Sequence, residues 1–313
     1  MNEPVGVLRL VDPFRAGDAW VPLAPPGYRV AVEQVSWPPR AADVTRLAAA
    51  VAREGARIVH AHGRWANLLG VPAARLVRAK AVCTRGPVCG LAESAALRAA
   101  DALMCASQEE RDRCVRREGI PAAKVWVVHP GVDVSRFAAR DPAPEPLVVA
   151  LGALFARNGY VDFLEAVARM RGAVPGLRVV CAGEGPLRPV LEQRIRHLGL
   201  RETVELPGHL ADVAALLARA HAAWAPGMPG TIEAMAAGVP VASPWRELIG
   251  ADLAVRRYDA PGLADRLLFL LQDQKIGPAL RKRAEKELSL DAFQRRVRAL
   301  YDAVLVPVRA QAA

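Results

Sequence analysis

The sequence predicts an α/β protein built from two doubly wound parallel sheets, each covered by helices. Strand-like and helix-like segments alternate twice, first up to residue 128 and again from residue 147. Between these runs lies a segment rich in proline and poor in helix signals, 129–146, which is typical of a linker. A length of 313 residues also suits two average domains. We therefore expect residues 1–143 to form the first domain and 144–290 the second, with a last helix, about 291–313, packing back on the first.

The first half begins with two apolar segments, 5–11 and 28–35, that predict strands. Prolines and glycines in the intervening 12–27 argue against a helix there. Val44, Leu47 and Val51 lie at helical spacing and predict a helix over 41–53. The alternation continues with strands at 57–62, 81–84, 102–105 and 124–128, and with helices at 65–80, 91–99 and 108–117.

The second half repeats the alternation and ends in helices. Its predicted strands occupy 147–151, 177–182, 203–206, 222–226 and 239–242, and its predicted helices 160–171, 187–198, 211–220 and 231–237. Three tail helices follow at 261–271, 278–288 and 291–304. Ligands of such sheets bind at the carboxyl ends of the strands, so we expect a site in the cleft where two such sheets face each other.

One stretch, from Trp224 to Pro244, combines a strand, a glycine-rich turn at 227–230 and a helix beginning at Thr231. The first N–H groups of a helix lack partners and its dipole is positive there, so this arrangement can bind a phosphate. We place Glu233 in the first helical turn, where it stabilises the helix or faces a ligand. From this stretch alone, an anion-binding loop and an ordinary strand–helix–strand connection are both open.

Composition excludes several protein classes. No apolar run is long enough to cross a membrane and the start lacks the features of a signal peptide, so we expect a cytoplasmic protein. The five cysteines show no CxxC spacing, and we expect them to be reduced and buried. The six histidines show no HExxH arrangement, so we expect no metal site. Scattered basic residues and only 5% aromatic residues argue against nucleic-acid binding.

The formal charge of +10 is distributed unevenly. Residues 1–140 hold 20 Lys and Arg against 13 Asp and Glu, whereas 141–313 hold 22 against 19. Two interpretations are open. A basic first half can favour a peripheral position on the anionic inner face of a membrane, and it is also what a solvated, arginine-rich surface gives, which is the more common case.

The chain resembles the family 4 glycosyltransferases, which are retaining enzymes of the GT-B fold. The resemblance covers roughly residues 40 to 305 and rests on motifs in the right order: RIVHAHGRWANLLG from Arg57, HPGVDVSRF from His129, VALGALFARNGYVDFLEA from Val149, VVCAGEGPLRPVLE from Val179, VELPGHLADVAALLARAHAAWAP from Val204 and IEAMAAGVPVAS from Ile232. It implies two Rossmann-like domains that face a cleft.

In that family the second domain holds most of a nucleotide-sugar donor, and the sugar is transferred with retained configuration and without a metal. The absence of a DxD motif agrees with this. The resemblance implies that Glu233 holds the ribose hydroxyls of a UDP- or GDP-sugar and that His62 lies near the transferred sugar. These two are the implied catalytic residues. The negative charge on the leaving diphosphate grows in the transition state, and fixed hydrogen-bond donors stabilise it. The backbone N–H groups that precede Glu233 fit this role.

The implied donor site includes the GEGP loop near the nucleotide and the loop at Gly208 and His209, which frames the base. Its residues are Gly152, Arg157, Asn158, Gly183, Glu184, Gly185, Gly208, His209, Gly230, Thr231, Ile232 and Glu233. Structural alternatives stay open: His62 can hydrogen-bond within the core of the first domain, and Gly183 and Gly185 can simply form a turn.

Several positions depart from the family pattern. The family's diphosphate-binding Arg and Lys are replaced by Ala153 and Asn158, and Arg157 lies one residue from the second. Loss of two charge-assisted bonds can cost several kcal/mol, at about 1.5 to 3 each. Ala225 occupies the position of the first Glu of the family's Glu pair, because the turn before Glu233 is short. The glycine-rich loop and first helix of the family have no counterpart in 12–27.

Two hypotheses follow. The first is a glycosyltransferase that moves a hexose-like sugar from a UDP- or GDP-sugar to a glycan or lipid-linked acceptor in the synthesis of cell-envelope polysaccharide or glycoconjugate. The second is a non-catalytic binding or scaffold subunit of the same fold, beside a partner glycosyltransferase. A nucleotide-sugar epimerase is a third and weaker alternative.

Overall fold

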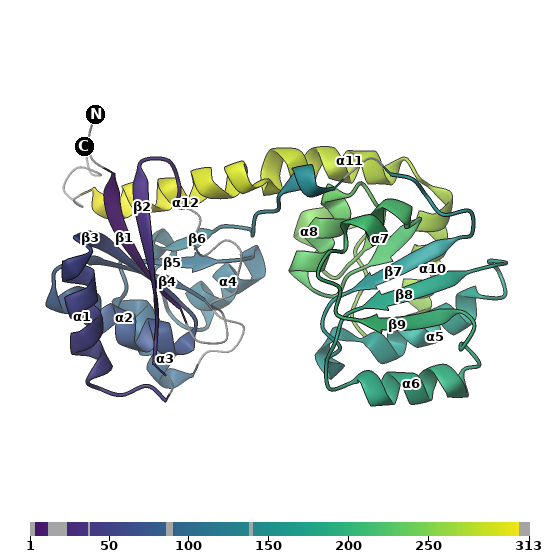
Figure 1. The fold of residues 1–313 in the computed structure, drawn as a ribbon, viewed down its shortest axis with the longest axis horizontal. Helices are drawn as coiled ribbons and strands as arrows, with labels where there is room; N and C mark the ends of the chain where they lie inside the picture. The colour runs from purple at the N-terminus through teal and green to yellow at the C-terminus, as the bar shows by residue number, and fades with distance from the viewer. Residues whose placement is uncertain (1–3, 12–23, 37, 86–89, 138–139, 307–313) are drawn as a thin grey trace. The chain divides into compact units, whose positions relative to one another are not determined.

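The structure, a computed structural model, describes residues 4–11, 24–36, 38–85, 90–137 and 140–306. It divides into two compact units, the first comprising residues up to 131 and from 291 onward, the second comprising 132–290 (Figure 1). Val132 belongs to the second unit because its N–H donates to Leu288 O at 2.8 Å and its own carbonyl accepts from Leu290 N–H at 3.1 Å. The division therefore falls earlier than the boundary expected at residue 143. The predicted loop at 12–27 lies mostly outside the described residues.

The first unit contains a parallel sheet with strand order β2-β1-β3-β4-β5-β6. Its strands are β1 (Val5–Val11), β2 (Tyr28–Gln34), β3 (Ala56–His62), β4 (Lys80–Thr84), β5 (Ala102–Cys105) and β6 (Val125–Val127). Its helices are α1 (Asp43–Arg53), α2 (Arg64–Leu76), α3 (Leu91–Ala99), α4 (Gln108–Arg116) and α12 (Leu290–Leu305), with a 3-10 turn at Ala122–Lys124.

Helices cover both faces of the first sheet. The larger core, typified by Leu8, Val59 and Leu47, joins one face to α1, α2 and α3. On the other face Val7 and Ile58 pack against α12 through residues such as Val297. The helix predicted over 65–80 ends earlier, at Leu76, because the chain turns through a left-handed residue, Arg78, with φ 58° and then enters β4.

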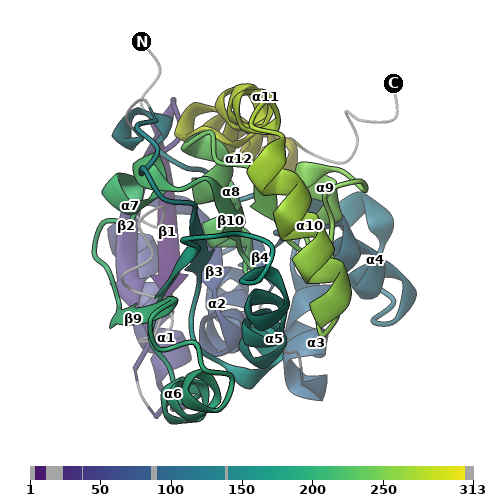
Figure 2. The same cartoon turned by 90° about the vertical axis from the view of Figure 1, so that its right-hand side faces the viewer.

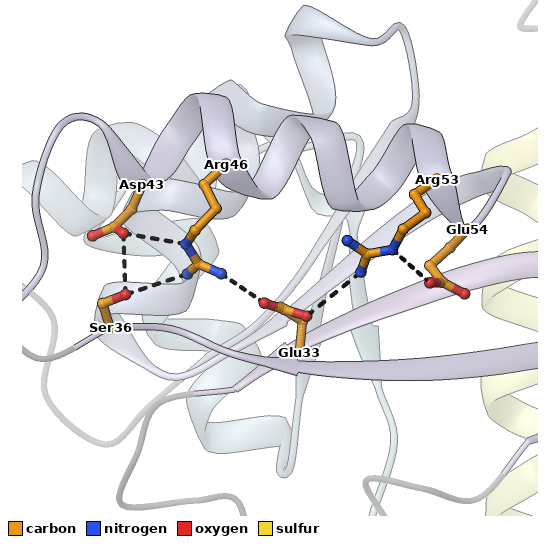
Figure 3. Close-up of polar contacts among 6 residues, drawn as sticks. All are labelled: Glu33, Ser36, Asp43, Arg46, Arg53 and Glu54. Atoms are coloured by element: carbon orange, nitrogen blue, oxygen red, sulfur yellow. Dashed lines mark hydrogen bonds and ion pairs between the residues drawn. The ribbon is translucent and has the colours of Figure 1, made fainter.

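A polar network joins the end of β2 to α1 (Figure 3). Asp43, in the first turn of α1, accepts from the Arg40 N–H at 2.8 Å and from Ser36 Oγ at 3.1 Å. These bonds, led by the one from the Arg40 backbone, lower the pKa of Asp43. Arg46 links this group to Glu33, with Nη1 and Oε1 2.6 Å apart. Exposed ion pairs of this kind contribute at most about 1 kcal/mol, so the network orients α1 more than it stabilises the unit.

The second unit contains a parallel sheet with strand order β11-β10-β7-β8-β9. Its strands are β7 (Leu147–Leu151), β8 (Arg178–Ala182), β9 (Val204–Gly208), β10 (Ala222–Trp224) and β11 (Val241–Ala242). Its helices are α5 (Tyr160–Met170), α6 (Arg188–His197), α7 (Ala214–Arg219), α8 (Met228–Ala236), α9 (Arg246–Ile249), α10 (Ala260–Gln272) and α11 (Ile276–Arg283). Short 3-10 turns lie at Val134–Arg136 and Ala156–Asn158, and a π-helical segment, Ala284–Leu288, follows α11.

The core of the second unit lies between its sheet and α5, α6 and α10. Figure 2 shows α5 and α10 next to each other on this side, and the two helices pack together. Trp224 of β10 stacks on Phe163 of α5 with ring centroids 4.9 Å apart, and Tyr160 meets its edge at 5.2 Å. These aromatic contacts anchor the strand that leads into α8.

Cys83, Cys105, Cys114 and Cys181 are free and buried, whereas Cys89 lies outside the described residues. Within the described ranges, none of the helices combines the length and the apolar character that crossing a membrane requires.

Candidate functional site

The second sheet has its topological switch point between β7 and β10. From β7 the chain continues to β8 and β9 on one side, and β10 and β11 lie on the other. Ligands of open α/β sheets bind outside the carboxyl ends of strands at such a point. Here the loop that begins at Gly152 and the segment from Ala225 into α8 follow the two strands that flank the switch point. A Cβ built on Gly230 of α8 would lie 2.9 Å from Leu151 Cβ, so α8 and β7 are in direct contact.

Backbone hydrogen bonds join the loop after β7 to the loop after β8. Gly152 N–H donates to Ala182 O at 3.2 Å, and Leu154 N–H donates to Glu184 O at 2.8 Å. Leu187 N–H closes the pairing by donating to Leu154 O at 3.0 Å. The two loops therefore form one rigid surface at the carboxyl edge of the sheet.

Two glycines of the GEGP segment are required by this pairing. A Cβ on Gly183 would collide with the carbonyl of Gly152, and a Cβ on Gly185 would lie 2.5 Å from Leu154 O. Real Cβ atoms do not approach backbone atoms so closely, and a backbone carbonyl held in a ladder cannot move aside. Close packing of the two loops thus accounts for both glycines, whether or not a ligand approaches them.

The remaining predicted residues of this edge lie beside β9. The loop implied by the resemblance at Gly208 and His209 begins one residue later, at His209. Gly208 is the last residue of β9, because Gly183 N–H extends the ladder to Gly208 O at 2.9 Å. His209 follows and is exposed. Glu184 forms a bidentate pair with Arg188, whose Nη2 lies 2.6 Å from Oε1, and these hydrogen bonds lower the pKa of Glu184.

The predicted turn at 227–230 was wrong, because α8 begins at Met228 with Gly227 as its N-cap. Pro229 is at the second helical position, where a proline needs no N–H partner and its fixed φ suits a helix. Thr231 N–H donates to Gly227 O at 3.1 Å, and its hydroxyl contacts Ser243 Oγ at 2.8 Å. Thr231 and Ile232 are therefore inside the helix, and the N–H groups that precede its first internal bond are those of Gly227, Met228 and Gly230.

Glu233 was predicted in the first turn of this helix, and this too was wrong: no acidic residue lies in the first turn of α8. Burial raises the pKa of its carboxyl group, Arg136 lowers that pKa and Asp212 raises it. Arg136 and Asp212 are themselves paired, with Nη2 and Oδ1 3.4 Å apart. Among the described residues no donor forms a hydrogen bond to the Glu233 carboxylate, so this partly buried group retains its full capacity to accept.

The two positions that lack the family's cations contact each other. Asn158 Nδ2 donates to Ala153 O at 2.7 Å and closes the loop after β7. Arg157 is exposed, with its guanidinium carbon 4.5 Å from the ring centroid of Phe155. The side chain thus folds along its own loop.

A second cation, Arg257, was missed by the sequence analysis. Its Nη2 donates to Pro226 O at 3.3 Å, next to the N-cap of α8, and the indole N–H of Trp245 donates to the same carbonyl at 3.2 Å. The following residue, Tyr258, has φ 64° and donates its hydroxyl to Arg157 O at 3.1 Å. No motif marks Arg257, because a chain turn after β11 brings it to the switch point.

The first unit has its own switch point between β1 and β3, and His62 lies there as the last residue of β3. It is fully buried, with its Nδ1 2.8 Å from Thr84 Oγ1. The ring of His60 lies 4.0 Å from that of His62, and its Nε2 contacts the same hydroxyl at 3.0 Å. His62 therefore occupies the predicted place at the carboxyl edge and is also part of a hydrogen-bonded core.

Two further buried polar residues gather at this edge. Asn67 of α2 donates from Nδ2 to Thr84 O at 3.1 Å and to Glu93 Oε1 at 3.2 Å, and both Asn67 and Glu93 are fully buried. The sequence does carry a signal for both residues. Each is a polar side chain at a position of its helix where an apolar residue would be expected.

Acidification is expected to destabilise the first unit through His60. Burial and the nearby Arg9 charge hold the pKa of His60 well below its usual value. The unfolded chain then binds more protons than the folded chain below pH 6.5, so stability falls as the pH drops. Between pH 6.5 and 5.5 the loss is about 1 kcal/mol. Thermal unfolding at both pH values measures it.

The decrease in stability that His60 causes between pH 6.5 and 5.5 should be absent in His60→Gln. It should persist in His209→Gln, which alters an exposed histidine of the second unit. An unchanged pH slope in His60→Gln would contradict the assignment.

Two family models match the chain. A model described as Glycosyltransferase Family 4 matches residues 12–136, and one described as Glycosyl transferases group 1 matches 145–273. Together they account for most of both units.

Named relatives agree with the family models. The putative colanic acid biosynthesis glycosyltransferase WcaL of Escherichia coli is 28% identical over 197 residues, which is 55% of this chain and 48% of that protein. A GDP-mannose-dependent alpha-(1-6)-phosphatidylinositol dimannoside mannosyltransferase of Mycobacterium tuberculosis is 30% identical over 213 residues, covering 59% and 53%. The alignments thus span about half the length of these relatives.

Similarity to solved structures extends over almost the whole chain. A glycosyltransferase from Rickettsia africae matches with a TM-score of 0.84 and 15% identity over 97% of this chain and 99% of its own. Anabaena HepE in complex with UDP matches with a TM-score of 0.82 and 16% identity, covering 96% and 100%. These likenesses show the fold, and the family models show the ancestry. The chain belongs to the family 4 glycosyltransferases and has the GT-B fold.

Proposed function

We propose that this chain transfers a sugar from a UDP- or GDP-sugar to a glycan or lipid-linked acceptor, with retained configuration and without a metal, in the synthesis of cell-envelope polysaccharide or glycoconjugate. Two observations carry the proposal: the N-terminus of α8 lies at the switch point of the second sheet, and the same helix holds the partly buried Glu233 carboxylate beyond its first turn. A helix N-terminus favours a phosphate, and a carboxylate without donors is ready to accept from ribose hydroxyls.

Two arginines offer positive charge in this part of the second unit, and one of them lies beside the N-cap of α8. Arg257 bonds to Pro226 O beside the N-cap, and Arg157 lies on the loop that Tyr258 ties to the same region. In our proposal they take over from the cations that are replaced by Ala153 and Asn158. The leaving diphosphate gains charge in the transition state, so fixed positive groups favour its departure.

The relatives support a donor of this class. HepE has been crystallised with UDP and with UDP-glucose, and one matched relative is named as GDP-mannose-dependent. Names such as colanic acid biosynthesis and phosphatidylinositol dimannoside mannosyltransferase motivate the envelope glycan or lipid-linked acceptor. The basic first half, with 20 Lys and Arg against 13 Asp and Glu in residues 1–140, would bring such an acceptor and its anionic membrane close. Co-sedimentation with anionic vesicles at low salt tests this peripheral association.

A second candidate function is nucleotide-sugar binding without transfer, as a subunit beside an active partner glycosyltransferase. The bond between Asn158 and Ala153 O favours it, because two positions that carry cations elsewhere in the family are here occupied in closing a loop.

Calorimetry with UDP and GDP, followed by a donor-hydrolysis assay, separates these functions. Arg257→Ala should weaken binding of the preferred nucleotide about tenfold, since a charge-assisted bond is worth roughly 1.5 kcal/mol or more. Arg256→Ala removes the same charge one residue away and should have a smaller effect. Failure of both nucleotides to bind at millimolar concentration would exclude the donor site. Binding without hydrolysis or transfer would favour the non-catalytic subunit.

A further inference from the structure

Five buried polar side chains form a continuous chain of contacts on the α12 face of the first sheet. Arg9 of β1 contacts the hydroxyl of Tyr301 through Nε and Nη2, both at 3.4 Å. The same hydroxyl lies 2.7 Å from Nδ1 of His60. His60 Nε2 lies 3.0 Å from Thr84 Oγ1, and this oxygen lies 2.8 Å from His62 Nδ1. Each of the five residues is at most 8% exposed, so solvent does not interrupt the chain.

The donor and acceptor properties of the groups give this chain a direction. A guanidinium can only donate, so both Arg9 contacts use the acceptor lone pairs of the Tyr301 oxygen. A phenol has one proton to donate, and the remaining contact of this oxygen is His60 Nδ1. Tyr301 therefore donates to His60. Burial raises the pKa of the phenol, which keeps that proton on the oxygen.

The direction passes through His60 to Thr84. Since Nδ1 of His60 accepts, a neutral ring carries its proton on Nε2 and donates it to Thr84 Oγ1. Burial and Arg9 hold the pKa of His60 well below its usual value, so the ring is neutral. The threonine hydroxyl, having accepted from His60, gives its only proton to its other contact, Nδ1 of His62.

We propose that Arg9, Tyr301, His60 and Thr84 act as positioning residues that hold His62 as the neutral tautomer with its proton on Nε2. His62 is then a hydrogen-bond donor at the carboxyl edge of β3 and not a proton acceptor. That the matching acceptor is an oxygen of the transferred sugar rests on the function proposed above, whereas the tautomer does not.

The opposite arrangement leaves protons without acceptors. If His62 carried its proton on Nδ1, Thr84 would donate to His60 Nε2, and His60 Nδ1–H would point at Tyr301. The Tyr301 oxygen would then accept from both Arg9 and His60. Among the described residues, none of its contacts would accept its own proton. A buried polar hydrogen without an acceptor costs about 1 to 3 kcal/mol, which selects the first arrangement by roughly tenfold or more.

Nitrogen NMR of the full chain with ¹⁵N-labelled histidine tests the inference without any ligand. Long-range ¹H–¹⁵N spectra distinguish Nε2–H, Nδ1–H and doubly protonated rings, and the signals of His60 and His62 are assigned by their loss in His60→Gln and His62→Gln. At pH 7.5 both rings should be neutral with the proton on Nε2. Thr84→Ser keeps the hydroxyl and should preserve this state in His62, whereas Tyr301→Phe should produce a mixture of tautomers.

A wild-type His62 ring with its proton on Nδ1, or protonated on both nitrogens at pH 7.5, would overturn the proposal. So would a Tyr301→Phe spectrum identical to that of the wild type, provided that circular dichroism shows the variant to be folded. A protein that binds neither UDP nor GDP but shows the Nε2–H tautomer would leave this inference standing and sink only the proposed transfer reaction.

Discussion

Replacing Gly183 by alanine is expected to destabilise the second unit by about 2 to 3 kcal/mol, the upper part of the range for overpacking. The added Cβ would collide with the carbonyl of Gly152, in the loop paired with the segment that contains Gly183. The carbonyl is held in place, because it accepts from the Tyr160 hydroxyl at 2.6 Å and the N–H of the same residue donates to Ala182 O. Relief of the collision must therefore break part of the ladder at the carboxyl edge.

Differential scanning calorimetry measures this effect, and a unit of this size should lose roughly 4 to 12 °C in Tm. Gly172→Ala is the matched control, because a Cβ there meets no atom within 4 Å and the backbone has no left-handed φ. The control should unfold within about 0.5 kcal/mol of the wild type. If both variants unfold together with the wild type, the two loops are not packed as described.

The same variant should also bind nucleotide less tightly, since the loops it separates border the switch point. If Gly183→Ala keeps full nucleotide affinity despite a lower Tm, the loops stabilise the unit without forming part of the donor site. The two measurements therefore separate a packing role from a binding role for the GEGP segment.

The alternation of apolar segments and helical spacing was enough to predict the regular architecture. The segment predicted as a strand at 147–151 has those bounds in the structure, and most other elements differ by only a few residues. Strands of a doubly wound sheet are buried on both faces, so their apolar runs are unmistakable. The two sheets and the GT-B fold followed from this pattern together with the ordered motifs.

Helix ends were predicted less well, because contacts with distant segments help to determine them. The residues Met228, Pro229 and Gly230 have the composition of a turn, yet they form the first turn of α8. Proline is tolerated there because its missing N–H is not needed, and Gly230 is demanded by the approach of Leu151. Contact with a strand far away in the sequence decided where this helix starts, and that contact leaves no local signal.

The surroundings of His62 were equally inaccessible to sequence reasoning. The histidine itself was found through its motif, but its hydrogen-bonded chain runs through Thr84 and His60 to Tyr301, in the last helix. Arg9, at the far end of these contacts, is a charged residue inside an apolar strand. The sequence shows that this is unusual but does not show which residue it contacts. Only the return of α12 to the first sheet brings the parts together.

Replacing Glu233 by glutamine is expected to weaken binding of the preferred nucleotide by about 10- to 100-fold, the equivalent of one charge-assisted hydrogen bond at 1.5 to 3 kcal/mol. A carboxylate can accept from two ribose hydroxyls at once, whereas an amide offers one oxygen. Titration calorimetry with UDP and GDP measures the change. Glu205→Gln, which neutralises an exposed carboxylate on β9 of the same unit, is the control and should bind as the wild type does.

Stability should move in the opposite direction, which separates binding from support of the fold. Burial raises the pKa of Glu233, so the folded state disfavours its charged form. This carboxyl group therefore stabilises the unit at low pH, and that contribution is lost as the pH rises from about 4.5, the value of an unperturbed Glu, through the raised pKa. At pH 7.5 Glu233→Gln should unfold at the same or a higher temperature than the wild type while binding nucleotide less tightly. A parallel loss of stability and affinity would instead make Glu233 a structural residue of α8.

The raised pKa also predicts how binding depends on pH. Only the ionised carboxylate accepts from both hydroxyls, so the affinity of the wild type should begin to fall at a pH above the usual Glu range as the solution is acidified. In Glu233→Gln this decrease should be absent. An equal pH dependence in both proteins would mean that another group controls it. Burial of Glu233 disfavours its charged form and so lowers the stability of the free protein. A bound nucleotide offsets this effect, because its ribose hydroxyls donate to the carboxylate. The same desolvation therefore makes the site selective for a ligand with two hydroxyl donors.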